Sequence, residues 1–431
     1  MVNDNYIVAI DLGTSRFMGM VGKKNPDGGF RVLAKESRDS KKFMQYGRII
    51  DTSEASMCIS MLIKGLENMI SKGKETRLEI EKVYVGVSGQ SLHSVEHSVA
   101  RIIRESTVTE DDIQALNREC RSHAEKIEGK VYCIMPPVYY LDGEATVNPL
   151  GAVCRQFKAS YQLIVGWPSV GSLPKDAVRD AHCGLAGSFV SPLALAEAIL
   201  DPEERKSGCI LIHLDFSVTA VTVYKDNSLV YFAVIPFGHS LITKDLMEGL
   251  DLNETDAETL KNDYANVAAN GNKTSSGAGS IEYIVDGRKL NNHKTDMIAG
   301  ARAREIVENV YSLLKTEVLS KSFGGSIKLI GEASELKGMT ELIASQFKLN
   351  VVQASVPPEW SGVKKEYLTA AALLAEGTEN CVKLPVKPEP VTDGNNKGGE
   401  DTGDTGNNTG PIKKDKGNFI TTITSILFES N

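Results

Sequence analysis

The sequence lacks the features that mark several classes of protein. No run of 18 apolar residues occurs, so no segment is expected to span a bilayer as a helix. The seven cysteines are odd in number and contain no C-x-x-C pair, which indicates reduced thiols rather than a disulfide framework. The seven histidines show no metal-ligand spacing with them, so no metal site is predicted. The first residues, MVNDNYIVAIDLG, carry acidic side chains and no basic segment, unlike a signal peptide.

An excess of positive charge is also missing. The chain has 48 lysines and arginines against 56 aspartates and glutamates, which gives a net charge of −8. This balance argues against nucleic acid as the main partner, because phosphate backbones bind to basic surfaces. The 431 residues, 41% of them hydrophobic, are enough for two or three domains with their own cores.

The chain does contain a repeated arrangement of strands. The first unit has a strand over 6–12, a tight turn over 13–15, a return strand over 16–22 and a third strand over 30–35. The second unit, about 200 residues later, has strands over 209–214, 220–224 and 229–236. Two such units predict two similar lobes that arose by internal duplication.

The first turn contains a candidate phosphate-binding loop, Asp11-Leu12-Gly13-Thr14-Ser15. Gly13 would let backbone N–H groups approach a phosphate, and the hydroxyls of Thr14 and Ser15 could donate to its oxygens. Asp11 could hold a metal-bound water. A plain β-turn with a buried aspartate is the structural alternative, and the repeated hairpin favours the phosphate loop.

Residues 82–166 fit neither repeat. They open with an alternating strand over 82–87 and continue with a helix that Thr109 and Asp112 can cap. Further strands are expected near 130–141 and 156–166. We interpret this segment as a small α+β domain inserted into the first lobe.

Together these features resemble the bacterial cell-division protein family FtsA, a divergent branch of the actin homologues. The motifs that carry the resemblance are D-L-G-T-S at 11–15, V-Y-V-G-V-S-G at 83–89, L-D-G at 141–143, N-P-L-G at 148–151, P-L-A-L-A-E-A at 192–198 and V-I-P-F-G at 234–238. The resemblance implies an α/β fold of the actin/Hsp70-ATPase type, with two lobes on duplicated ribonuclease-H-like cores and an inserted α+β domain. The implied division is a first lobe at 1–81 and 167–204, an insert at 82–166, a second lobe at 205–384, a linker at 385–416 and a terminal helix at 417–431.

The chain departs from the family at its second phosphate loop, D-x-G-G-G-T-T-D. In the ungapped register His213 replaces the leading acid, and the three glycines become Asp215, Phe216 and Ser217. A rival register with a local gap makes Asp215 the leading acid, so that Asp215, Ser217 and Thr219 form the loop.

The adenosine loop of the family, T-G-G-G, reads Ile330-Gly331-Glu332-Ala333 and keeps only Gly331. We therefore expect ATP with Mg²⁺ to bind weakly or not at all, and hydrolysis to be inefficient. No catalytic residue is assigned.

The last segment predicts attachment to a membrane surface. Residues 385–416 are mostly small and polar, which indicates a disordered linker with a reach of about 30 Å. The following apolar residues recur at helical spacing on one face: Phe419, Ile420, Ile423, Ile426 and Leu427. Phe428, the next residue, is also assigned to membrane binding. A helix of about 20 Å is too short to cross about 30 Å of hydrocarbon. Docking of this segment on its own core or on a partner is the alternative.

The resemblance implies a scaffold that tethers FtsZ filaments to the cytoplasmic face of the cell membrane at the division site. Such proteins self-associate into filaments and recruit later division proteins. Arg302 lies where the family helix carries an arginine associated with FtsZ binding, and a merely solvated arginine is the alternative. Two other functions stay open: an actin-like ATPase or small-molecule kinase, and a type IV pilus assembly adaptor.

Overall fold

The structure is a computed structural model that describes residues 6–25, 29–73, 79–103, 107–269, 282–285, 288–321 and 323–380. Its first lobe is built on a five-stranded sheet in the order β12-β6-β1-β2-β3. The strands are β1 (Tyr6–Leu12), β2 (Arg16–Lys24), β3 (Phe30–Asp39), β6 (Lys82–Val87) and β12 (Gly184–Val190). The hairpins β1–β2 and β2–β3 are antiparallel, whereas β6 runs parallel to β1 and to β12.

The second lobe repeats this sheet in the order β19-β18-β13-β14-β15. Its strands are β13 (Cys209–Leu214), β14 (Thr219–Lys225), β15 (Ser228–Ile235), β18 (Ser326–Ile330) and β19 (Val351–Gln353). The β13–β14–β15 pairings are antiparallel, and β18 runs parallel to β13 and β19. The predicted duplication is therefore confirmed, down to the pairing directions.

Helices cover both faces of the first sheet. They are α1 (Thr52–Ser71), α3 (Ser169–Asp180), α4 (Ser191–Ile199) and α10 (Leu368–Asn380), and two short strands, β4 (Met44–Gln45) and β5 (Arg48–Ile49), lie before α1. A Cβ at Gly19 would lie 2.4 Å from Leu62 of α1, and one at Gly22 would lie 2.5 Å from Leu374 of α10. Side chains three residues apart in a strand point to opposite faces, so α1 and α10 lie on opposite sides of the sheet.

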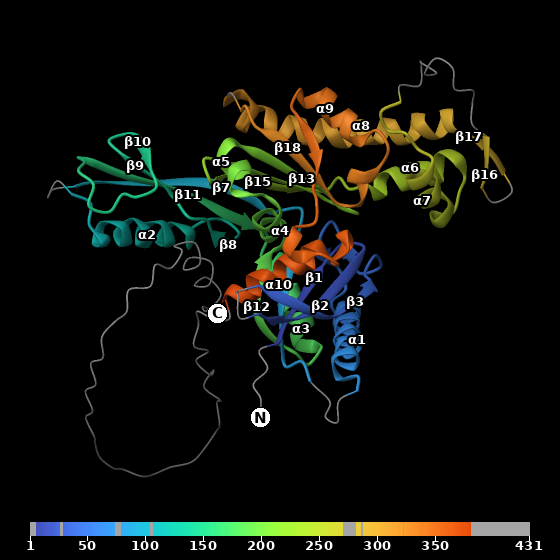
Figure 1. Cartoon of the computed structure of the whole chain (residues 1–431), viewed down its shortest axis with the longest axis horizontal. Helices are drawn as coiled ribbons and strands as arrows, with labels where there is room; N and C mark the ends of the chain where they lie inside the picture. The colour runs from blue at the N-terminus through green and yellow to red at the C-terminus, as the bar shows by residue number, and fades with distance from the viewer. Residues whose placement is uncertain are drawn as a thin grey trace, which may run out of the picture.

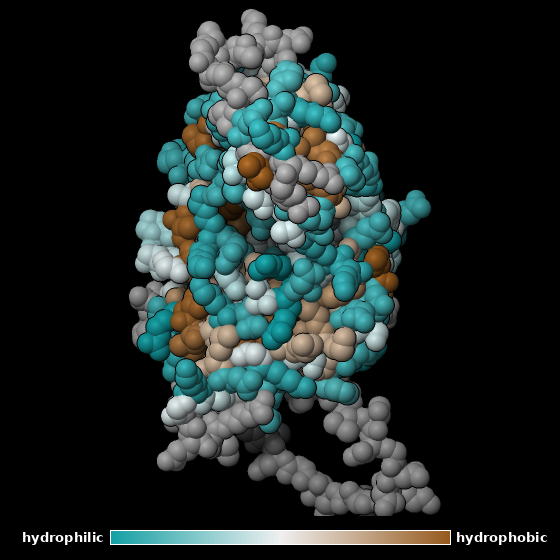
Figure 2. All heavy atoms as spheres, turned by 90° about the vertical axis from the view of Figure 1, so that its right-hand side faces the viewer, coloured by the Kyte–Doolittle hydropathy of each residue, from teal (hydrophilic) through white to brown (hydrophobic). Residues whose placement is uncertain are grey.

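The second lobe carries the helices α5 (Pro202–Ser207), α6 (Ser240–Leu250), α7 (Glu254–Asp263), α8 (Asn292–Glu317) and α9 (Met339–Phe347), and the hairpin β16 (Glu282–Val285) and β17 (Arg288–Asn291). Single 3₁₀ turns occur in this lobe at Leu319–Lys321 and Glu332–Glu335. Two more, at Pro358–Trp360 and Lys365–Tyr367, pack on the core of the first lobe. The end of the molecule where α6 and α7 lie is mainly hydrophilic, with hydrophobic side chains in scattered small groups (Figure 2).

The insert forms its own layer of helix on sheet. It contains β7 (His93–Ile102), α2 (Glu110–Ala124), β8 (Lys130–Ile134), β9 (Val138–Leu141), β10 (Glu144–Thr146) and β11 (Gln156–Gly166). The capping box is present, because the Thr109 N–H donates to Asp112 Oδ2 at 3.0 Å and the Asp112 N–H donates to Thr109 Oγ1 at 3.2 Å. Pairing of His93 in β7 with Ala233 in β15 joins the insert to the second lobe in one ten-stranded sheet (Figure 1).

Two predicted boundaries need correction. The strand at 82–87 belongs to the first lobe, where β6 pairs with β1 and β12, and not to the insert. The sequence also predicts that residues 354–380 belong to the second lobe. In the structure they pack into the core of the first lobe through Ala354, Trp360 and Leu373. Helix α10 lies beneath the second lobe, against the first sheet (Figure 1). Local apolar patterns predict that a segment is buried, but they do not identify the sheet that buries it.

Among the described helices, none combines the length and the apolar content needed to cross a bilayer. The six cysteines in the described ranges are free and buried. The predicted linker and terminal helix lie outside the described residues, and so do all six proposed membrane-binding residues from Phe419 to Phe428.

Candidate functional site

The two repeated hairpins present their turns to each other. In the first, Leu12 pairs with Phe17 and Asp11 with Met18. In the second, Leu214 pairs with Thr219 and His213 with Ala220. The two turns therefore have the same length, so His213 is the structural counterpart of Asp11, and Asp215 and Phe216 are the counterparts of Gly13 and Thr14. This correspondence favours the ungapped register.

A small cavity lies where the two turns meet. Its volume is about 10 Å³, roughly the room that one water needs. It is lined by Asp11, Leu12, Gly13, Thr14, Ser88, Ser191, Pro192, His213, Asp215, Val218, Ala220 and Thr369. No lysine or arginine is among these lining residues, so the cavity offers a phosphate no positive side chain.

The ionisable groups of the cavity are unusual. Burial raises the pKa of Asp11 to about 7, the hydrogen bond from Ser191 Oγ at 2.7 Å opposes this rise, and the charge of Asp215 adds to it. Burial lowers the pKa of His213, which the nearby carboxylate of Asp215 partly offsets. The cavity is therefore a place where anionic charge is already unfavourable.

The turns are in direct contact. Thr14 is only 2% exposed, and its hydroxyl lies 3.4 Å from Asp215 Oδ2 and accepts the Ser217 N–H at 3.2 Å. The N–H of Phe216 donates to Asp215 Oδ1 at 2.7 Å. As a result, the backbone of the second turn is directed toward groups of the protein itself.

The remaining predicted phosphate-site residues do not line the cavity. Ser15 accepts the Ser40 N–H through its backbone carbonyl at 3.0 Å, and the Ser217 hydroxyl is buried without a hydrogen-bond partner. Thr219 is fully buried, and its hydroxyl donates to the carbonyl of Phe237 at 2.5 Å. Gly331 has φ +98°, and a Cβ there would lie 2.3 Å from the Leu214 carbonyl oxygen, so this glycine is required for packing.

A buried polar cluster lies beside the second turn. Lys261 of α7 is 1% exposed and contacts Glu258 at 2.7 Å, Thr243 at 3.0 Å and His239 Nδ1 at 3.1 Å. Burial lowers the pKa of Lys261, and the Glu258 carboxylate opposes this. His239 Nε2 lies 3.4 Å from Glu332, without hydrogen-bond geometry. The ammonium group of Lys261 is therefore paired with the Glu258 carboxylate inside the cluster.

Arg302 lies on α8 and is engaged within the molecule. Its Nε and Nη2 atoms donate to the two carboxylate oxygens of Asp245 on α6 at 2.7 and 3.0 Å, and Nη1 donates to Glu305 at 2.6 Å. The guanidinium is 26% exposed. Arg302 therefore bridges α6 and α8 and is not simply a solvated arginine.

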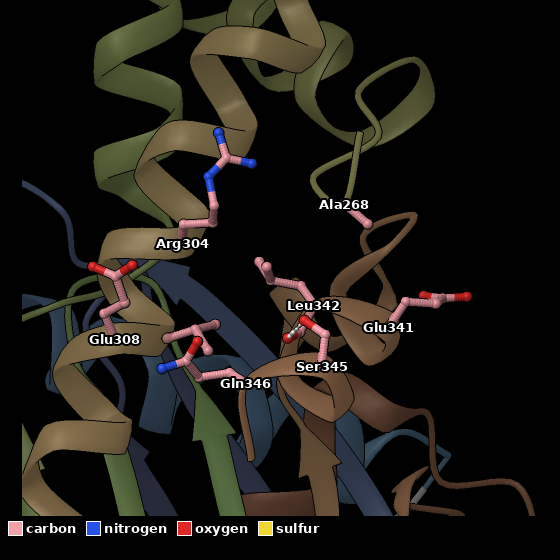
Figure 3. A pocket seen from close by; sticks show the side chains of 8 residues that line it. Ala268, Arg304, Glu308, Glu341, Leu342, Ser345 and Gln346 are labelled. Atoms are coloured by element: carbon pink, nitrogen blue, oxygen red, sulfur yellow. Dashed lines mark hydrogen bonds between the residues drawn. The ribbon is translucent and has the colours of Figure 1, made fainter. Parts of the chain in front are cut away.

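A larger cavity of about 350 Å³ lies on α8 and α9 (Figure 3). Arg304 stands at one end of it, and its Nη1 atom is buried without a hydrogen-bond partner. Glu308 and Glu341 project at the sides, and Leu342 lies between the helices. The charged residues of the lining are thus one guanidinium and two carboxylates.

Sequence reasoning missed several residues of the cleft. Ser191 follows β12 directly, and the carboxyl ends of parallel strands meet at one edge of a sheet, so its proximity to Asp11 was predictable in principle. Lys261 lies three residues after Glu258 on α7, a helical spacing that could have been noticed. Thr369 comes from α10, and no local signal places that helix at the cleft.

Comparisons with known proteins fit this architecture. The profile described as "Cell division protein FtsA" matches residues 216–372, and that described as "SHS2 domain inserted in FTSA" matches residues 89–165. The chain is 27% identical over 338 residues to the cell division protein FtsA of Porphyromonas gingivalis, covering 78% of this chain and 69% of that one. It is 23% identical over 403 residues to FtsA of Escherichia coli K12, covering 87% and 90%. A solved structure, the PilM-PilN type IV pilus biogenesis complex, shares the fold with a TM-score of 0.58 at 13% identity, covering 86% and 98%.

Two duplicated lobes that face each other across paired turns define an actin-like ATPase fold, here with an inserted SHS2 domain. The start of the SHS2 match, at residue 89, agrees with the assignment of β6 to the first lobe. The chain belongs to the FtsA family of cell-division proteins.

Proposed function

We propose that this chain is a division scaffold that tethers FtsZ filaments to the cytoplasmic face of the cell membrane, self-associates and recruits later division proteins. The observation that carries the proposal is the combination of an actin-like body with an SHS2 insert in an FtsA-family sequence. The one-sided apolar pattern of residues 418–428 supports the membrane part.

The experiment is co-flotation of the chain and FtsZ with anionic liposomes. Deletion of residues 418–431 should leave both proteins at the bottom of the gradient. Ile423→Glu, on the apolar face, should weaken flotation strongly, whereas Thr422→Glu, on the polar face, is the matched control and should weaken it little. Flotation of the truncated chain would refute the assignment of the membrane contact.

We assign the FtsZ contact to the region of Arg302. Arg302→Ala should abolish recruitment of FtsZ to the liposomes. Asp245→Asn keeps the guanidinium and removes only the negative charge that is paired with it, so this variant should still recruit FtsZ if Arg302 contacts FtsZ directly. If the arginine only bridges α6 and α8, both variants should reduce recruitment alike and lower the melting temperature alike. Separation of the two variants supports direct contact.

Mg-ATP is proposed to bind weakly and to be hardly turned over. A carboxylate about 4 Å from a phosphate costs about 4 kcal/mol at an effective dielectric of 20, roughly a thousandfold in affinity before any metal compensates. The cavity presents Asp11 and Asp215 and no lysine or arginine among its lining residues. Calorimetry with Mg-ATP tests this: a dissociation constant in the low micromolar range, or phosphate release that Asp11→Ala abolishes, would contradict it.

A further inference from the structure

We propose that the second turn, residues 215–218, is part of a clasp that holds the two lobes together without a nucleotide. The clasp consists of Thr14 and Lys41 from the first lobe and Phe216, Ser217 and Glu254 from the second. The substitutions that depart from a glycine-rich phosphate loop would then supply the bridging groups themselves. This inference does not depend on membrane or FtsZ binding.

Lys41 is held in a fixed position by the first turn. The adjacent Ser40 is fully buried, its N–H donates to the Ser15 carbonyl at 3.0 Å, and its hydroxyl donates to the Gly13 carbonyl at 2.8 Å. The backbone N–H of Lys41 donates to Asp39 at 3.1 Å. The lysine side chain therefore starts from an anchored point beside the candidate phosphate loop.

From that point Lys41 reaches two groups of the second lobe. Its Nζ lies 4.8 Å from the centre of the Phe216 ring, within the range of a cation–π contact, and 2.6 Å from Glu254 Oε1 at the start of α7. Each contact alone is weak at this exposure. Because one ammonium group serves both, however, ordering the lysine once secures two contacts across the cleft.

Phe216 is equally well fixed on its own side. Its ring meets the His239 ring edge-on, with centres 5.6 Å apart and an interplanar angle of 88°. Its carbonyl accepts the Ser240 N–H at 2.9 Å, and a Cβ at Gly238 would lie 2.2 Å from that oxygen. Gly238 thus permits the close packing that holds the Phe216 ring toward the first lobe.

The third contact is the hydrogen bond from the Ser217 N–H to the Thr14 hydroxyl at 3.2 Å. It uses a backbone donor that would otherwise be free to bind a phosphate oxygen. Two of the three contacts are made by the turn itself, through Phe216 and Ser217, and the third is made by Glu254 at the start of α7. A glycine at position 216 would provide neither the ring for Lys41 nor the contact with His239.

Hydrogen–deuterium exchange of the full chain, read on peptides that cover residues 213–219, tests the clasp. Phe216→Leu keeps apolar bulk and removes the aromatic face, and Lys41→Met keeps the side-chain stem and removes the charge. Each should speed exchange of these amides by about threefold to tenfold, and the double variant should speed it by less than the product of the two single effects, because both substitutions remove the contact between Lys41 and Phe216. The matched control Lys244→Met, an exposed lysine of α6 that pairs only with Glu248 of the same helix among described residues, should leave exchange unchanged.

Exchange at the wild-type rate in both single variants would overturn the proposal, and so would fully additive effects. Slow exchange of 213–219 in the unaltered chain only after Mg-ATP is added would overturn it as well, since the clasp acts without nucleotide. Glu254→Gln provides a milder test if a variant fails to fold, and it should give a smaller acceleration in the same peptides.

Discussion

At the scale of single residues, Asp11 couples folding to pH. Its pKa in the folded protein is about 7, against an ordinary value of 3.8, so the folded state binds this proton more tightly than the unfolded chain does. The resulting stabilisation is fully present below about pH 4 and is lost as the pH rises to about 7.

Asp11→Asn should therefore flatten this part of the pH profile. The asparagine still accepts the Ser191 hydroxyl but carries no charge, so the variant should be more stable than the parent at about pH 8 by up to a few kcal/mol, and similar to it at about pH 4. Thermal unfolding of both proteins across this range checks the prediction. Asp263→Asn, at an exposed position, is the control. Parallel profiles for Asp11→Asn and the parent would contradict the assignment.

Substitutions at three glycines can distinguish the cost of backbone strain from the cost of steric crowding. Gly331 has φ +98° and no room for a Cβ, Gly362 has φ +89° with nothing within 4 Å, and Gly324 has neither constraint. Alanine should therefore destabilise most at Gly331, by about 2–4 kcal/mol, less at Gly362, by about 1 kcal/mol, and negligibly at Gly324. Denaturant melts of the three variants measure the free energy of unfolding and should give this order. An equal loss at Gly331 and Gly362 would show that the backbone of β13 moves away from a Cβ at position 331 at little cost.

Residue identity predicted part of the site. The loop 11–15 could be recognised because glycine and hydroxyl residues have a direct chemical meaning after a strand. The roles of Lys41 and Phe216 could not, because they arise from a contact between residues about 175 positions apart in sequence. Read alone, Phe216 is only an obstacle to phosphate.

At the scale of elements, local signals worked well and long-range assignment did not. Thr109 and Asp112 predicted the start of α2 because a capping box is complete within four residues. The strand β6 was recognised as a strand but placed in the wrong domain. Its buried residues Val83 and Val85 would suit any hydrophobic core. At position 86, by contrast, Leu373 and Ser191 occupy the space that a Cβ would need, so that a glycine is required there.

The position of β6 leads to a prediction about excision. Removal of residues 89–165 should leave a folded two-lobed protein of reduced stability that has lost partner recruitment or self-association. Removal of 82–166 also deletes the strand between β1 and β12 and should prevent folding. Circular dichroism melts of the two deletions distinguish the outcomes. Cooperative melting of both would mean that the first sheet closes without β6.

At the scale of the whole molecule, the duplication was visible because both units share turn spacing and strand order. What the sequence did not indicate is how the parts join. The single pairing of His93 with Ala233 merges the insert with the sheet of the second lobe, although the insert departs from the first lobe along the chain. Such edge pairings depend on geometry that only the folded chain supplies.

We predict that residues 385–416 act only through their length and composition. Scrambling their order should leave liposome binding and FtsZ recruitment within about twofold of the parent, because a chain of small polar residues has no sequence-specific contacts to lose. Shortening the same segment to about a quarter of its length is the contrasting variant and should reduce recruitment. Loss of recruitment in the composition-preserving scramble would reveal a binding motif.

The return of α10 to the first lobe determines how the molecule would carry tension. The described part of the chain ends at Asn380, in a helix packed on β1, whereas the proposed FtsZ contact at Arg302 lies on the second lobe. A pull between membrane and filament would thus enter through one lobe and leave through the other. The cleft would carry this load before either core does, and its resistance would set how firmly the filament follows the membrane.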